Sequence, residues 1–156
     1  MRKWENGKND RAAREMISTD TKIRVRYADT DQMKFVYYRK YFEYFEQGRS
    51  DLLRRVGMPY PEIEKMGYFL PVIEAHAEYK QSAFYDDEIT VRTTIDEIPQ
   101  ARVRITYLVF RSEGEGPIAT GYTVHSFMNA EKRIPTRAPK EFIEVLTKQF
   151  AGSAGS

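Results

Sequence analysis

The stretch Arg26–Arg49 reads RYADTDQMKFVYYRKYFEYFEQGR, and it decides the fold predicted for this sequence. An alternating segment leads into it, and two aspartates separated by one residue follow. The chain then runs through a loop into a segment where aromatic residues recur at helical spacing. A strand, an acidic loop and a long amphipathic helix are therefore predicted in this order.

The ends of these two elements follow from residue spacing. Residues 22–28 alternate between apolar and charged side chains, as in a half-buried strand. From about Tyr38 apolar residues recur every three or four positions as far as Val56, which predicts a helix of about five turns. Gly57 and Pro59 predict its end, because glycine adopts the left-handed capping conformation and proline cannot continue the helix. The predicted apolar stripe comprises Tyr38, Phe42, Phe45, Leu52, Leu53 and Val56.

Four further strands and a short helix are predicted after the long helix. The strands cover residues 69–84, 89–98, 102–111 and 117–129, and the closing helix covers residues 140–150. Short polar connections between the strands favour an antiparallel meander. The predicted fold is α+β, with a five-stranded antiparallel sheet wrapped around one long central helix and a short C-terminal helix.

The length of 156 residues suits a single domain. Residues 1–20 are polar and are predicted to be an N-terminal extension, with the folded domain at residues 21–150. Residues 151–156, AGSAGS, have the composition of a flexible linker.

Composition argues against several classes of protein. The 25 Lys and Arg residues nearly balance the 23 Asp and Glu residues. The sequence therefore lacks the clustered positive charge that non-specific binding to nucleic acid requires. Without Cys and with only two His, thiolate chemistry is excluded and a metal site is not expected. No apolar run is long enough to span a bilayer, and the start lacks the apolar core of a secretory signal. A cytoplasmic protein is therefore predicted.

A family resemblance rests on the quoted stretch together with YKQSAFYDDEITV at residues 79–91 and ATGYTVH at residues 119–125. Over about residues 21–150 the chain resembles the 4-hydroxybenzoyl-CoA thioesterase-like branch of the hotdog superfamily. The resemblance implies a hotdog fold and a homo-oligomer that hydrolyses acyl-CoA thioesters. It implies no cofactor, because coenzyme A is part of the substrate.

The resemblance also implies the main site residues. The second aspartate of the Asp-x-Asp loop, Asp31, corresponds to the catalytic carboxylate, which acts as a nucleophile or as a general base on water. Backbone amides near Tyr38 would form the oxyanion hole, and Tyr38 would contact the substrate. From the residues alone, capping of a turn is the better explanation for both aspartates, and it is retained for Asp29.

Four more residues are candidates for substrate binding: Glu46, Lys34, Arg102 and Arg104. The resemblance would place Glu46 beside the pocket, although an ion pair with Arg49 on the helix surface is the alternative. Arginines and lysines could bind the phosphates of coenzyme A, although solvated charge is the better explanation for each of them.

The chain departs from the family pattern beside Asp31. Lys34 stands where the family usually has glycine, and Lys40, preceded by Arg39, stands where asparagine is common. These cations either adapt the site to an anionic acyl group or to phosphates, or they reduce its activity. The terminal segments and the apolar Leu108 and Phe110 raise an alternative, an engineered or altered scaffold that serves assembly. The enzyme itself is predicted to be a dimer or tetramer.

Overall fold

A computed structural model describes residues 16–154, which form a five-stranded sheet, a pair of short strands and three α-helices. The predicted order of strand, long helix, four strands and closing helix is confirmed, and α3 arises in a segment predicted as a loop. The elements are β1 (Ile17–Arg24), the 3-10 turn η1 (Tyr27–Asp29), α2 (Lys40–Arg55), α3 (Tyr60–Lys65), β2 (Tyr68–Phe69), β3 (Val72–Tyr79), β4 (Glu88–Ile95), β5 (Arg102–Phe110), β6 (Pro117–Ser126), β7 (Met128–Asn129) and α4 (Lys140–Ala154).

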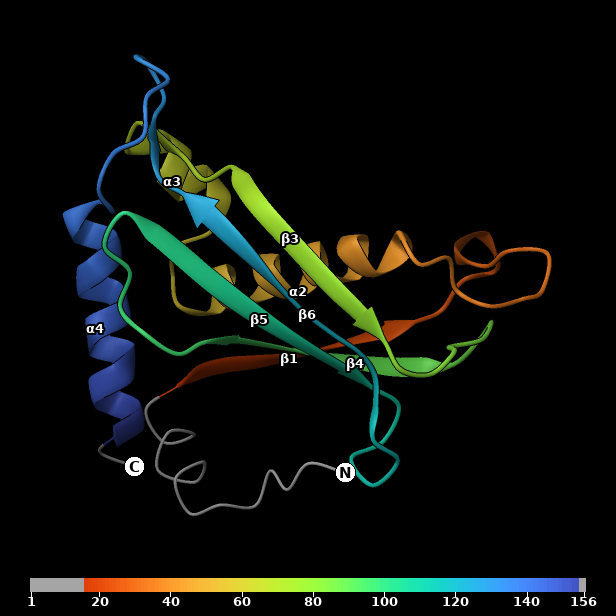
Figure 1. The fold of residues 1–156 in the computed structure, drawn as a ribbon. Helices are drawn as coiled ribbons and strands as arrows, with labels where there is room; N and C mark the ends of the chain where they lie inside the picture. Colours follow the sequence, from red (N-terminus) through yellow and green to blue (C-terminus); the bar gives the residue numbers. More distant parts are fainter. Residues whose placement is uncertain (1–15, 155–156) are drawn as a thin grey trace.

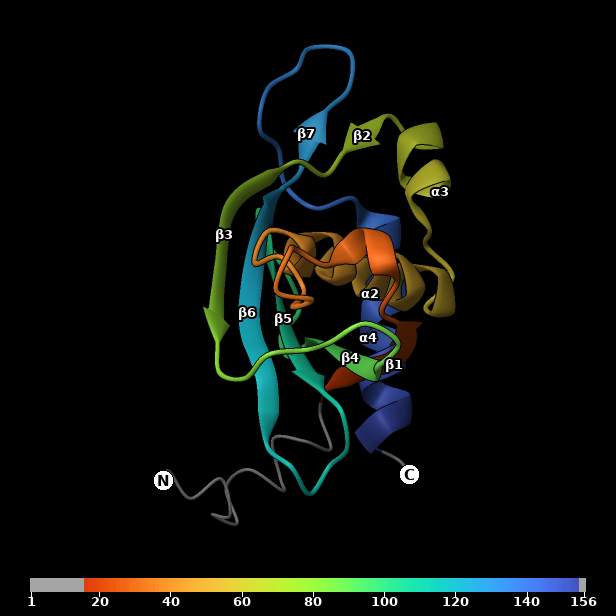
Figure 2. The same ribbon diagram turned by 90° about the vertical axis from the view of Figure 1, so that its right-hand side faces the viewer.

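The five-stranded sheet has the spatial order β1-β4-β5-β6-β3, and all its pairs are antiparallel. β3, β6 and β5 lie in front of α2 in Figure 1, and β4 and β1 lie below it. The turned view in Figure 2 shows the sheet curving around this helix. The predicted α+β fold, a sheet wrapped around a long helix, is confirmed.

The predicted meander is wrong for β3, which pairs with β6 at the far edge of the sheet instead of with β4. The two strands are three positions apart, about 14 Å at the usual strand spacing. Residues 80–87 join them, and an extended segment of that length reaches about 26 Å, so it crosses the end of the sheet easily.

The first strand lies earlier in the chain than predicted. β1 begins at Ile17 and ends at Arg24, so residues 17–20 of the predicted extension belong to the sheet. Its inward positions include the polar residues Thr19 and Thr21. The hydropathy of this segment therefore does not alternate as it does in a strand with apolar inward residues. At the other end, α4 continues to Ala154 within the predicted linker. Residues 1–15 and 155–156 lie outside the described part.

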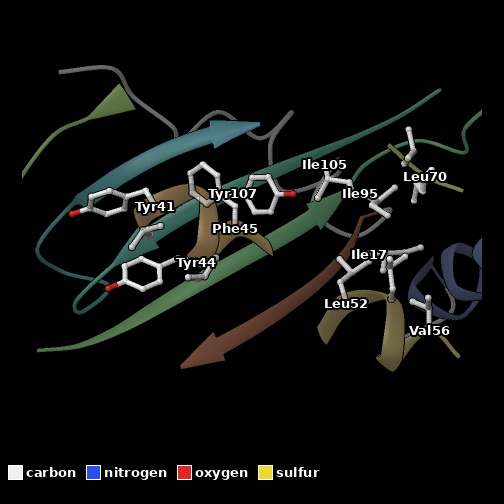
Figure 3. Close-up of a cluster of buried hydrophobic side chains, with 14 of the residues drawn as sticks. Ile17, Tyr41, Tyr44, Phe45, Leu52, Val56, Leu70, Ile95, Ile105 and Tyr107 are labelled. Carbon is white, nitrogen blue, oxygen red and sulfur yellow. The ribbon is translucent and has the colours of Figure 1, made fainter. Parts of the chain in front are cut away.

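Helix α2 fills the concave face of the sheet, and its end at Arg55, with Gly57 at a φ of 86°, is as predicted. The predicted apolar stripe is wrong at its start, because Tyr38 is 68% exposed and Phe42 36% exposed. The inward face instead includes Tyr41 and Tyr44, as Figure 3 shows. Tyrosine is amphipathic, and its ring is buried readily where its hydroxyl finds a partner.

The core beneath α2 contains a directional chain of polar groups. Arg49 Nη1 donates to the Tyr107 hydroxyl at 3.0 Å, which lies 2.7 Å from Thr123 Oγ1. Thr123 Oγ1 lies 2.9 Å from Nε2 of His125, whose Nδ1 lies 3.1 Å from the Leu70 carbonyl oxygen. Burial lowers the pKa of His125 to about 4, so the neutral ring donates to Leu70 and accepts from Thr123. The expected alternative of an Arg49–Glu46 surface ion pair is wrong, because Arg49 is buried in this network.

The convex face of the sheet is less apolar than its sequence suggests. Phe110 is buried within the chain, since the Arg92 guanidinium lies 4.9 Å from the centre of its ring. Leu108 is half-buried. No helix among residues 16–154 is long and apolar enough to cross a membrane.

Candidate active site

Asp29 anchors the loop between β1 and α2. Its carboxylate is buried and accepts hydrogen bonds from the Arg26 amide at 3.1 Å, the Arg26 guanidinium at 3.2 Å and the Tyr44 hydroxyl at 3.0 Å. Burial alone would raise the pKa of Asp29, but the hydrogen bonds from Arg26 and Tyr44 outweigh it and lower the pKa. The structural role expected for Asp29 is confirmed.

Asp31 lies two residues further along, at the start of a tight turn. Its Oδ1 accepts hydrogen bonds from the amides of Met33 at 2.9 Å and Phe35 at 3.2 Å. Its Oδ2 has no protein donor within hydrogen-bond distance among residues 16–154. Lys34, which completes the turn, has a φ of 67°, the left-handed region that glycine adopts freely. One oxygen of Asp31 therefore orders the loop while the other stays available.

The turn before α2 presents backbone donors. The Tyr37 amide donates to the backbone carbonyl oxygen of Asp29 at 3.1 Å, and the Lys40 amide donates to the carbonyl oxygen of Tyr37 at 3.0 Å. These two hydrogen bonds fix both ends of the turn. Between them, the amides of Tyr38 and Arg39 have no protein acceptor in the described part of the chain. These unused N–H groups lie at the positive end of the helix dipole, where a developing negative charge is stabilised.

A row of tyrosines surrounds this turn. The Tyr79 ring lies 6.4 Å from the Tyr38 ring and 5.3 Å from the Tyr41 ring, measured between centres, and the Tyr41 ring lies 5.8 Å from the Tyr44 ring. Burial raises the pKa of Tyr41 to about 12, and burial with the hydrogen bond to Asp29 raises that of Tyr44 further. The Tyr41 and Tyr44 phenols therefore keep their protons at physiological pH.

The three unexpected cations have different environments. Lys40 lies 2.8 Å from a Glu43 carboxylate oxygen and 3.7 Å from Asp29, so its charge is compensated. The Arg39 guanidinium is exposed and lies 5.6 Å from the centre of the Tyr37 ring. Lys34 is exposed on the turn that Asp31 begins. Of these three cations, Lys34 and Arg39 are therefore exposed without a carboxylate partner among the described residues, and Lys34 lies on the Asp31 turn.

The remaining candidates are not gathered around Asp31 within one chain. Glu46 is exposed on α2, more than one helical turn beyond the helix start at Lys40. Arg102 is exposed at the beginning of β5. The Arg104 guanidinium lies 3.9 Å from the centre of the Tyr122 ring, on the sheet face opposite α2. These three residues stay predictions.

Two clefts among residues 16–154 are lined by neither Asp31 nor Tyr38. One, of about 410 Å³, lies between β1 and α2 and is lined mainly by charged residues, including Lys22, Arg24 and Asp29. The other, of about 450 Å³, is mainly apolar and lies between α3 and the β2–β7 pair. Asp31 is partly exposed and lies outside both of these clefts. In the described part no three His, Asp or Glu side chains are grouped as metal ligands.

A five-stranded antiparallel sheet curved around one long helix is the architecture of the hotdog fold. Residues 25–148 match the family described as the "Thioesterase-like superfamily", and the chain belongs to this family. The predicted family membership is confirmed.

Individual relatives agree with this membership. The chain is 34% identical over 93 residues to the "Putative acyl-CoA thioesterase YneP" of Bacillus subtilis, covering 60% of this chain and 67% of that protein. The DHNA-CoA thioesterase structure from Staphylococcus aureus is 29% identical with a TM-score of 0.78, covering 89% of this chain and 95% of that one. A hypothetical protein from Thermus thermophilus is 33% identical with a TM-score of 0.77, covering 83% of this chain and 98% of that one.

Sequence patterns missed two features of the site, the contacts of Lys40 with Asp29 and of Tyr79 with the helix start. Tyr79 Oη donates to the Tyr38 carbonyl oxygen at 3.0 Å, although 41 positions separate the two residues. No local spacing signals such a contact. It arises because β3 lies at the sheet edge beside the start of α2.

Proposed function

We propose that this chain hydrolyses acyl-CoA thioesters to a free acid and coenzyme A, with Asp31 as the catalytic carboxylate. The observation that carries the proposal is that the two carboxylate oxygens of Asp31 have different hydrogen-bond environments. Oδ1 is held by two amides of its own loop, and Oδ2 is left without a protein partner in the described part. Membership of the thioesterase-like family, and a relative named as an acyl-CoA thioesterase, support the substrate class.

The proposed reaction follows from a carboxylate and backbone donors placed at one helix start. Asp31 takes a proton from water as the water oxygen adds to the thioester carbonyl carbon, or a carboxylate oxygen of Asp31 adds to that carbon itself. The amides near Tyr38 stabilise the negative carbonyl oxygen. The carbon–sulfur bond then breaks, and the coenzyme A thiolate leaves and is protonated. The water route gives the free acid directly, whereas the direct route leaves an anhydride with Asp31, which water then cleaves to the free acid and the Asp31 carboxylate.

The accessible cations bear on the substrate. Lys40 is compensated by Glu43 and Asp29, whereas Lys34 and Arg39 are exposed. We therefore favour the adaptation of the site to an anionic acyl group or to phosphates of coenzyme A. Arg102, Arg104 and Glu46 stay secondary candidates, because they would reach a substrate at Asp31 only across an assembly of chains.

The test compares wild-type protein with Asp31→Asn on a panel of short, long and aromatic acyl-CoAs. We expect the variant to lose about 10²- to 10⁴-fold in kcat, the usual contribution of a general base or more. Asp96→Asn, which changes an exposed aspartate in the loop after β4, is the matched control and keeps full activity. Equal turnover by Asp31→Asn would remove Asp31 from the mechanism. Absence of turnover on every substrate would favour the alternative, a scaffold that serves assembly.

We further propose that the active form contains a second copy of the chain against the edge strand β3. Val72, Ile73 and Tyr79 on this strand are each nearly half exposed, and an unpaired edge strand offers backbone groups for a partner. Asp31 is partly exposed and lines neither of the two clefts described above, and a second chain would supply the enclosure that a substrate pocket needs. Light scattering on the purified protein tests this: a dimer or tetramer is expected, and a monomer would contradict it. A much larger closed particle would support the scaffold alternative.

A further inference from the structure

Tyr79 connects the edge of the sheet with the start of α2. It is the last residue of β3, and its hydroxyl donates to the Tyr38 carbonyl oxygen at 3.0 Å. The same carbonyl accepts a weaker bond, 3.3 Å long, from the Tyr41 amide. Tyr79 therefore supplies the shorter of the two contacts that orient the peptide between Tyr38 and Arg39.

The orientation of this peptide decides where one backbone donor points. A trans peptide is planar, so its C=O and the following N–H point in opposite directions. A hydrogen bond that fixes the Tyr38 carbonyl therefore also fixes the Arg39 N–H. That N–H has no protein acceptor among residues 16–154. A donor to the carbonyl also polarises the peptide and strengthens the N–H as a donor, because linked hydrogen bonds reinforce one another.

We propose that Tyr79 is a positioning residue for thioester hydrolysis, whose hydroxyl holds the Arg39 N–H toward the thioester oxygen. The proposal rests on the hydrolysis proposed above. Tyr79 does not touch the reacting atoms in this scheme, since it acts on the far side of the peptide. Its effect appears in the transition state, when the thioester oxygen becomes negative and the oriented donor matters most.

Packing alone does not account for the hydroxyl. Tyr79 is 46% exposed, and its ring contacts with Tyr38 and Tyr41 would be kept by phenylalanine. Partial burial and the neighbouring Tyr38 phenol raise the pKa of Tyr79, so the hydroxyl keeps its proton at neutral and moderately alkaline pH. The residue is a permanent donor to the Tyr38 carbonyl.

The experiment measures steady-state hydrolysis of an acyl-CoA that the wild type turns over, using Tyr79→Phe in the full chain. The variant removes one oxygen and keeps the ring. We expect kcat to fall about three- to tenfold, the range of one ordinary hydrogen bond, with KM and the thermal midpoint almost unchanged. Tyr122→Phe is the matched control: it removes a tyrosine hydroxyl that donates to Glu74 on the other sheet face, and it keeps full activity.

The outcomes separate this inference from the proposed function. If Asp31→Asn is inactive while Tyr79→Phe keeps its kcat, the positioning role is refuted and the hydrolysis stands. A higher KM with unchanged kcat also refutes it, because it indicates a substrate contact instead. An equal loss in Tyr122→Phe refutes it as well, since the loss would then be general. If Asp31→Asn is as active as wild type, the proposed mechanism fails, whatever Tyr79→Phe does.

Discussion

At the scale of single residues, the Asp31 turn combines an ordering role with an exposed reactive atom. Oδ1 is used twice by the loop's own amides, so the carboxylate is held in place without any contact to Oδ2 in the described residues. The turn also requires a left-handed residue, and the chain places a lysine there. Such a conformation costs a non-glycine residue about 1 kcal/mol or more, so Lys34 is retained against a cost in stability.

The Lys34→Gly variant tests this cost. We expect its free energy of unfolding to rise by about 1 kcal/mol, because glycine adopts the required φ without strain. Urea denaturation measures it. Gln32→Gly, at the neighbouring exposed position in the same turn, is the control and should lose stability, because glycine there only adds freedom to the unfolded chain. If both variants lose stability alike, the lysine is not strained.

Asp29 gives the protein a predictable acid sensitivity. Because its pKa is lower in the folded state than the unfolded value of about 3.9, it stabilises the fold above that value. This stabilisation is lost as the pH falls from the unfolded pKa through the folded one. Tyr44→Phe removes one of the donors to this carboxylate, so we expect the free energy of unfolding to fall by about 1 to 3 kcal/mol at pH 7. We also expect the free energy of unfolding to decline less steeply with falling pH than in the wild type. Denaturation curves at pH 7 and pH 3 measure both, with Tyr37→Phe as an exposed control. A decline in Tyr44→Phe as steep as in wild type would contradict the assignment.

At the scale of elements, the fit of α2 on the sheet is set by small residues where backbones approach closely. A methyl group at Gly48 would overlap Thr93 Oγ1 and lie 3.0 Å from Val91 Cγ1, both on β4. Gly121 on β6 is equally restricted, since a methyl group there would lie 2.7 Å from the Phe45 ring. The helix therefore packs closely against β4 at Gly48 and against β6 at Gly121.

Gly48→Ala tests this packing. Alanine would stabilise an exposed helix position by about 1 kcal/mol, but here we expect a loss of about 2 kcal/mol from overpacking. Adding Thr93→Ala should recover much of the loss, because it removes the overlapping hydroxyl, which has no partner among the described residues. Chemical denaturation of the two single variants and the double variant measures the coupling. A gain in stability for Gly48→Ala alone would contradict the close contact.

At the scale of the whole molecule, the uncovered edge strand and the position of Asp31 both favour a second copy of the chain. β3 leaves an edge and several apolar side chains uncovered, and neither cleft of the chain is lined by Asp31. A second copy against β3 would satisfy both conditions at once. We therefore expect association and catalysis to depend on each other.

Ile73→Lys tests that link. Ile73 is 48% exposed on β3, and a lysine there would place a charge in the proposed interface. We expect the molar mass to fall toward that of a monomer at low protein concentration, with kcat falling in parallel. Ile134→Lys changes another exposed isoleucine, 52% exposed and outside the named strands, and should change neither. Full activity in a monomeric Ile73→Lys protein would show that the site is complete in one chain.

The sequence was most informative where structure is local. The long helix, its end at Gly57 and the four later strands follow from spacing and turn residues, because neighbouring residues decide helix and strand periodicity. The start of β1 at Ile17 was missed because buried threonines interrupt the hydrophobic pattern. The family resemblance identified Asp31 and Tyr38 as site candidates.

The sequence by itself determined the class of fold, the family and the position of the acidic loop before the long helix. Only the tertiary structure decided that β3 crosses to the far edge, that Arg49 is buried, and that Tyr79 contacts the Tyr38 carbonyl. These are contacts between segments far apart in the chain. They depend on which strands pair and how the helix is rotated on the sheet, and local periodicity carries no information about either.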